Sequence, residues 1–184
     1  MTGLPEPLPH EAPATGSEVE SLVGSLERQR RIFIWKCSGV DAAGMATTTA
    51  TSSLTLGGLL KHTARVEDEW FGVRLLGRAP AEPWASVDWE ARPDWEWRSA
   101  ADDSPEELTA LWEQTVARSR AAVAAAFGDG GLDRLSAWRR ADGTGLSLRR
   151  LVIDMIEEYA RHAGHADLIR EAVDGLVGEE PPLI

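Results

Sequence analysis

The sequence contains one cysteine, Cys37, and this scarcity excludes two kinds of structure. A single thiol cannot form an intramolecular disulfide, and it cannot supply the several sulfur ligands of a cysteine-based metal cluster. We expect Cys37 to be a small core residue of the first helix.

Long apolar segments are also missing. No stretch of the sequence approaches the length of about 18 consecutive apolar residues that a membrane span requires. The N-terminus has neither the basic start nor the apolar core of a signal peptide. We therefore expect a soluble, cytoplasmic protein.

Positive charge is in short supply, because 19 basic residues stand against 30 acidic ones and the net charge is −11. Binding to nucleic acid depends on basic side chains that neutralise phosphates. Attraction to an anionic membrane surface depends on basic clusters in the same way. We expect neither nucleic acid nor a membrane as a partner.

The composition that remains is that of a globular protein. The chain has 184 residues, of which 43% are hydrophobic and 27% charged, which suits one domain with its own core. Residues 1–16 carry four prolines and no periodicity, so we expect a flexible tail there. The domain is expected over residues 17–176, followed by a short C-terminal tail at 177–184.

Apolar residues at three- and four-residue spacing predict four helices. Thr55 and Ser104 are typical N-cap residues, and Pro105 with Glu107 completes the start of the third helix. No convincing alternating strand pattern is present. The sequence therefore predicts an all-α fold, an antiparallel four-helix bundle with long connecting loops. The predicted helices cover residues 17–37, 55–77, 105–127 and 146–173.

The longest connection, residues 78–104, contains four of the eight tryptophans. These side chains could roof a cavity that takes an apolar or sugar-bearing substrate. Alternatively, they pin a long loop to the helices. The sequence leaves both interpretations open for Trp84, Trp89, Trp95 and Trp97.

The last predicted helix carries polar residues on its apolar face. At 100° per residue, Glu158, His162 and His165 fall between Leu151 and Ile169 on one face. The apolar residues at both ends mark that face as turned toward the core. A carboxylate buried without a partner is costly, so this face needs a compensating group.

The second predicted helix repeats the anomaly, with His62 among apolar residues. Glu158 and His162 are four residues apart, so their side chains lie on adjacent turns. Adding His62 from another helix gives two imidazoles and one carboxylate, the ligand set of a catalytic zinc site with one open position. Nickel suits the same ligands.

Simpler interpretations remain for each residue. Glu158 and His162 could form only a hydrogen-bonded pair, and His62 could be a core histidine whose polar atoms are satisfied. His165 could be a ligand, a donor to a ligand or a pocket residue. Glu69 shares the face of His62 and could hydrogen-bond a ligand imidazole or face solvent.

Two segments of the chain resemble the DinB-like superfamily of metalloproteins. They are LLKHTARVEDEWF at residues 59–71 and MIEEYARHAGHADLIRE at residues 155–171. The similarity is strongest to the actinobacterial branch related to mycothiol-dependent maleylpyruvate isomerases and thiol S-transferases. It extends over about residues 18–175. Members of this superfamily are similar four-helix bundles that bind a divalent metal through three side chains.

The resemblance implies the same three ligands. His62 and His162 match the superfamily's histidines, and Glu158 stands where many relatives have histidine and the isomerases have glutamate. Asp154 departs from the histidine expected in close relatives, so it could tune the site or lie at its edge. Trp70 is expected near the face of His62, as part of the surrounding pocket.

Three functions are compatible with these residues. The resemblance favours a zinc enzyme that activates a low-molecular-weight thiol such as mycothiol for S-transfer to, or isomerisation of, an electrophilic substrate. The alternatives are a metal-dependent hydrolase with the same ligands, and a non-catalytic protein that binds a metal or small molecule. The superfamily also implies a homodimer.

Overall fold

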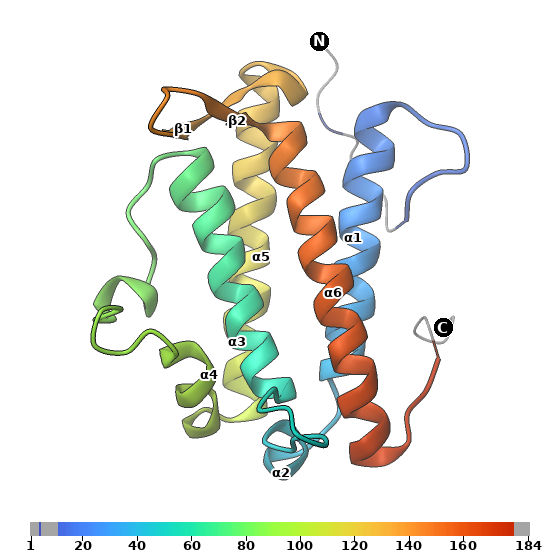
Figure 1. Cartoon of the computed structure of the whole chain (residues 1–184). Coiled ribbons are helices and arrows are strands. Elements are labelled where there is room, and N and C mark those ends of the chain that lie inside the picture. Colours follow the sequence, from blue (N-terminus) through green and yellow to red (C-terminus); the bar gives the residue numbers. More distant parts are fainter. Residues whose placement is uncertain (1–3, 5–10, 179–184) are drawn as a thin grey trace.

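The computed structural model describes residue 4 and residues 11–178, and it is mainly helical. Most of the two predicted tails, 1–16 and 177–184, lies outside the described residues, so their predicted flexibility is not tested. Within the described part, no helix is both long enough and apolar enough to cross a membrane. Long helices lie side by side along the molecule (Figure 1). They are α1 (Glu18–Cys37), α3 (Leu56–Glu67), α5 (Pro105–Gly128) and α6 (Leu148–Asp174).

The long helices alternate in direction only in part. Helices α1 and α6 run from the upper to the lower end in Figure 1, and α3 and α5 run the opposite way. Helix α1 packs mainly against α6, and α3 packs mainly against α5. Short helices occupy the connections: α2 (Ala42–Met45) and α4 (Trp95–Ser99), with 3₁₀ turns at Trp84–Ser86, Ala100–Asp102 and Gly131–Asp133.

The helix starts follow the sequence signals. The hydroxyl of Thr55 accepts the backbone N–H of Gly58, and the hydroxyl of Ser104 accepts that of Glu107. The Glu107 carboxylate in turn accepts a hydrogen bond from the backbone N–H of Ser104, which completes a capping box. The predicted N-caps are therefore confirmed, because each satisfies an amide that the helix leaves free.

The second predicted helix is not α-helical to its end. Helix α3 stops at Glu67, and the chain continues as a π-helix over Asp68–Leu75. A π-helix closes its hydrogen bonds one residue later than an α-helix. Side chains beyond Glu67 therefore leave the face that 100° spacing assigns to them.

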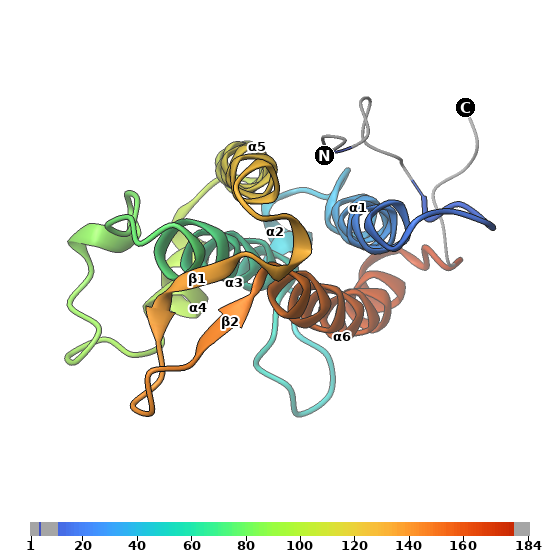
Figure 2. The ribbon, with the colours of Figure 1, turned by 90° about the horizontal axis from the view of Figure 1, so that it is seen from above.

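The prediction of an all-α chain without strands was wrong in one segment. Strands β1 (Leu135–Arg139) and β2 (Gly145–Ser147) form an antiparallel hairpin with an irregular register. The hairpin lies at the upper end of the molecule in Figure 1, which faces the viewer in Figure 2, and β1 contacts the π-helix there. Ser136 is the one buried residue of β1, and its hydroxyl accepts the N–H of Leu146. An alternating apolar pattern is absent because the buried position is polar.

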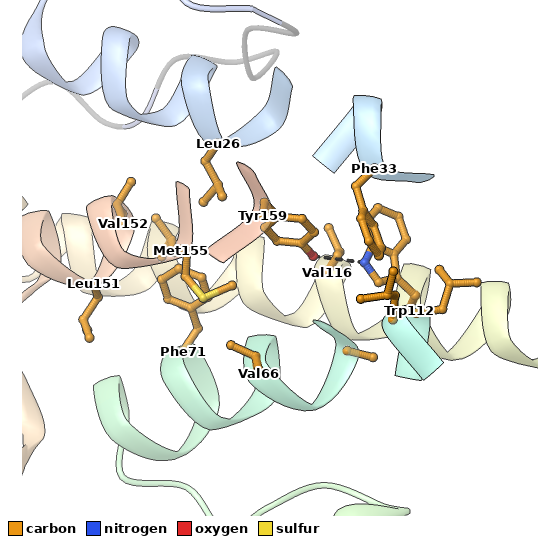
Figure 3. Close-up of a cluster of buried hydrophobic side chains, with 14 of the residues drawn as sticks. Leu26, Phe33, Val66, Phe71, Trp112, Val116, Leu151, Val152, Met155 and Tyr159 are labelled. Atoms are coloured by element: carbon orange, nitrogen blue, oxygen red, sulfur yellow. Dashed lines mark hydrogen bonds between the residues drawn. The ribbon is translucent and has the colours of Figure 1, made fainter. Parts of the chain in front are cut away.

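The core lies between the long helices and is rich in aromatic contacts (Figure 3). Phe33 of α1 meets Tyr159 of α6 edge to face, with ring centroids 5.5 Å apart. The indole N–H of Trp112 on α5 donates to the Tyr159 hydroxyl at 3.0 Å. Cys37 is fully buried in the same cluster, as expected for a core residue.

A buried carboxylate, Glu67, joins three of these helices. Arg30 of α1 donates to both of its oxygens, at 2.7 and 2.8 Å. The Tyr159 hydroxyl donates to it at 2.9 Å. Arg30 also donates to Glu27, which Arg120 of α5 contacts from the surface. The network satisfies charges that would be costly to bury alone.

We expect Arg30→Met to lower the free energy of unfolding by about 3–5 kcal/mol, because it leaves the Glu67 charge buried without its main partner. Chemical denaturation monitored by circular dichroism measures this change. Arg98→Met, which removes the exposed ion pair with Asp94, is the control and should have a much smaller effect. Equal stability of the two variants would contradict this account of the core.

Candidate metal centre

The structure brings His62 of α3 together with Glu158 and His162 of α6. The Nε2 atoms of both histidines lie 3.1 Å from Oε1 of Glu158. One potential ligand atom from each residue lies within 4.8 Å of the other two. The two imidazole rings meet edge to face, with centroids 4.9 Å apart. Three residues separated by up to 100 positions in the sequence therefore converge on one point.

The two helices explain this convergence. In α6 the four-residue spacing stacks Glu158 and His162 on adjacent turns of one face. Helix α3 supplies His62 from a position five residues before Glu67. Because Glu67 accepts the hydroxyl of Tyr159, the neighbour of Glu158, this contact sets the two helices in register.

The donor set fits a divalent metal. Ligand atoms about 2.0 Å from a tetrahedral zinc ion lie about 3.3 Å from one another, close to the two contacts of Glu158. The His162 side chain is 9% exposed, that of His62 14% and that of Glu158 27%. The site is therefore enclosed on the histidine side and opens past the carboxylate, where a fourth ligand could enter.

The charges of the cluster favour a metal-binding carboxylate. The hydrogen bonds from His162 and His62 hold the pKa of Glu158 well below its usual range. Burial lowers the pKa of His62, but the hydrogen bonds to Glu158 and Glu96 outweigh burial and leave that pKa above its usual value. Glu158 is therefore ionised at neutral pH, as a metal ligand must be.

Glu96 and Trp97 belong to this site, although the helical pattern of the sequence does not single them out. Oε1 of Glu96 lies 3.4 Å from Nδ1 of His62, on the ring edge opposite Glu158. The Trp97 ring stacks on the His62 ring, with centroids 4.5 Å apart and planes 22° apart. Both residues come from α4, within the connection that has no helical period. The sequence feature that pointed to this connection was its high content of tryptophan.

The other tryptophans of the connection hold it to α3. Trp95 and Trp89 pack beneath Lys61 and Arg65, with the cationic groups 4.4 and 4.8 Å from the ring centroids. Trp84 packs edge to face against Trp95. The packing therefore favours the second interpretation, in which these side chains pin the loop, and the roof over a substrate cavity stays a prediction. Trp84, Trp89 and Trp95 pin the connection, and Trp97 contacts the candidate site.

A pocket of about 500 Å³ lies beside Glu158. Trp70 lines it from the π-helix, and Arg161 lines it from α6. Asp154 is also part of its wall, where its carboxylate pairs with Arg150 at 2.7 Å. The structure thus places Trp70 and Asp154 at the pocket that adjoins the three converging residues.

His165 and Glu69 have different surroundings. Nδ1 of His165 lies 3.3 Å from Nδ1 of His162, on the side of that ring away from Glu158. Partial burial lowers the pKa of His165, and the nearby His162 and Arg161 act in the same direction. Glu69 accepts a hydrogen bond from Arg74 at 2.8 Å and is not among the residues that line the pocket. Glu69 lies in the π-helix, which shifts the side chains that follow Glu67 around the axis and so separates Glu69 from the face of His62.

Comparison with known families identifies the chain. Curated proteins and solved structures give no match. The family model described as Mycothiol-S-transferase matches residues 21–175, which include every residue of the candidate site. This confirms the resemblance drawn from the two sequence segments. The chain belongs to the Mycothiol-S-transferase family.

Proposed function

We propose that this protein is a zinc-dependent S-transferase that uses mycothiol, with His62, Glu158 and His162 as the metal ligands. The observation that carries the proposal is the convergence of two imidazole nitrogens and one carboxylate oxygen beside an open pocket. The family supports the thiol part of the proposal. We also propose that α1, α3, α5 and α6 are the four-helix bundle of the DinB-like superfamily.

The chemistry of such a centre is the activation of a thiol. A divalent metal with an open position deprotonates a thiol that binds to it, which makes the sulfur a nucleophile at neutral pH. With a metal bound, the two histidines would be neutral ligands, and Glu158 would supply the single negative charge of the set. Nickel suits these ligands as well, and zinc is our choice because three such ligands and an open position are typical of catalytic zinc.

The nucleophilic sulfur has to come from a substrate. Cys37 is the one cysteine of the chain and is fully buried. Burial raises the pKa of the Cys37 thiol far above its usual value, which makes it unreactive. A small-molecule thiol is therefore the expected nucleophile, and because such thiols stay reduced in the cytosol we place the activity in the cytoplasm.

The pocket beside Glu158 is the proposed place for the thiol and its electrophile. Its volume of about 500 Å³ lies in the range of small-molecule sites. Trp70 offers an aromatic face for a sugar ring or an apolar electrophile. Arg161 adds a positive charge at the same wall.

We expect the purified protein to hold about one equivalent of zinc, and His62→Ala, Glu158→Ala and His162→Ala each to lose it while remaining folded. Elemental mass spectrometry measures the metal, and circular dichroism reports the fold. Glu157→Ala is the matched control, because it removes an exposed carboxylate one residue from Glu158. A wild-type protein that stays empty after incubation with zinc would contradict the proposed centre.

Zinc affinity should fall as the pH is lowered. The pKa of His62 is raised, so a proton occupies this imidazole at higher pH than usual and must leave before zinc binds. Below that pKa we expect the apparent affinity to drop roughly tenfold per pH unit for each proton released. Competition with a chromophoric chelator between about pH 5.5 and pH 8 measures it. An affinity that does not change over this range would be the opposite result.

Turnover should require both the metal and an added thiol. With mycothiol and an alkyl or aryl halide, the thiolate sulfur forms a bond to carbon, and the halide leaves with the electron pair. We expect Glu158→Gln to slow thioether formation by about 100-fold or more, the scale of losing a main electrostatic contribution. Mass spectrometry of the product measures the rate, with Glu171→Gln as the control, because Glu171 is an exposed carboxylate of α6 that does not line the pocket. Metal-dependent hydrolysis of substrates without any thiol would instead favour a hydrolase.

A further inference from the structure

We propose that Glu96 is a positioning residue for the metal centre: it accepts a hydrogen bond from Nδ1–H of His62 and so leaves the Nε2 lone pair free for the metal that Glu158 and His162 would share. This inference rests on the proposed function, because it concerns the residue that holds a ligand. It assigns a role to the short helix α4, which the family match does not.

The two edges of the His62 ring face two different carboxylates. Nε2 lies 3.1 Å from Glu158, and Nδ1 lies 3.4 Å from Glu96. A neutral imidazole carries its hydrogen on one nitrogen and a lone pair on the other. A hydrogen on Nδ1 satisfies Glu96, which only accepts when it is ionised, and it leaves the Nε2 lone pair for a metal that Glu158 would share. A carboxylate behind a ligating histidine typically strengthens metal binding in this way.

Glu96 forms an ion pair with Arg65, but its carboxylate is more deeply buried than such a pair requires for stability alone. Its side chain is 3% exposed, and Nε of Arg65 donates to the same oxygen that faces His62, at 3.0 Å. The other oxygen, Oε2, is buried and has no hydrogen-bond partner in the described part of the chain. Leaving a buried acceptor unpaired is costly. A pair with Arg65 alone could form at the surface without this cost.

The packing of α4 fixes Glu96 relative to His62. Trp97, the next residue, stacks on the His62 ring and limits its tilt. Gly58 makes room for that indole, because a Cβ atom there would come within 3.0 Å of the Trp97 ring. Trp95, the residue before Glu96, packs beneath Lys61 on the neighbouring position of α3. Three successive residues of α4 therefore contact the segment of α3 that carries His62.

Two variants separate the hydrogen bond from the charge. Glu96→Leu removes the acceptor at similar volume, and we expect it to weaken zinc binding by about 10–100-fold. Glu96→Gln keeps an acceptor and loses the charge, so its affinity should lie between those of Glu96→Leu and the wild type. Chelator competition measures both affinities. In the zinc-loaded wild type, nuclear magnetic resonance should show a slowly exchanging Nδ1 proton on His62, retained in Glu96→Gln and fast-exchanging in Glu96→Leu.

Asp103→Asn is the control. It weakens the Lys61–Asp103 ion pair, which ties the same connection to α3 without involving His62. Its zinc affinity should match the wild type. Wild-type affinity in both Glu96 variants, or an equal loss in Asp103→Asn, would overturn the inference while leaving the metal site intact. If Glu96→Leu does not fold, wild-type affinity in Glu96→Gln decides against it. A wild type that binds no zinc would instead refute the proposed function.

Discussion

The buried carboxylate of Glu67 is the constraint on which the rest of this structure depends. It is fully buried and receives hydrogen bonds from Arg30 of α1 and Tyr159 of α6, while Trp112 of α5 donates to the same tyrosine. Apolar side chains can slide past one another at little cost, but a buried charge keeps its partners at one set of positions. Glu67 therefore sets how the long helices stand relative to one another.

The hydrogen bonds of Glu67 also set the geometry of the candidate site. Tyr159 and Glu158 are neighbours on α6 and point in different directions, one to the core and the other to the pocket. Once Tyr159 donates to Glu67, Glu158 and His162 come level with His62, which lies about one and a half turns before Glu67 on α3. A polar contact that has no part in the chemistry thus positions the residues that would perform it.

The sequence predicted the residues whose positions follow the helical period, and it missed those that lie outside regular α-helices. His62, Glu158 and His162 could be singled out because polar residues stand out against an apolar stripe at 3.6-residue spacing. The π-helix changes that spacing after Glu67, and its effect on Glu69 could not be read from a pattern that assumes 100° per residue. The sequence did not predict the hairpin, because the one buried residue of β1 is a serine and gives no apolar alternation. Glu96 lies 34 positions from His62, and only the fold of the connection brings them together.

The distribution of charge around His62 suits the proposed thiol chemistry. In the proposed zinc site, Glu158 would cancel one of the two positive charges of the metal and leave the other to attract an anionic sulfur. A second carboxylate would repel that sulfur if its charge were unbalanced. Arg65 donates to Glu96 and balances it, so Glu96 can orient His62 without making the pocket more negative. At the pocket wall Arg150 balances Asp154 in the same way, and Arg161 adds a positive charge beside Glu157 and Glu158.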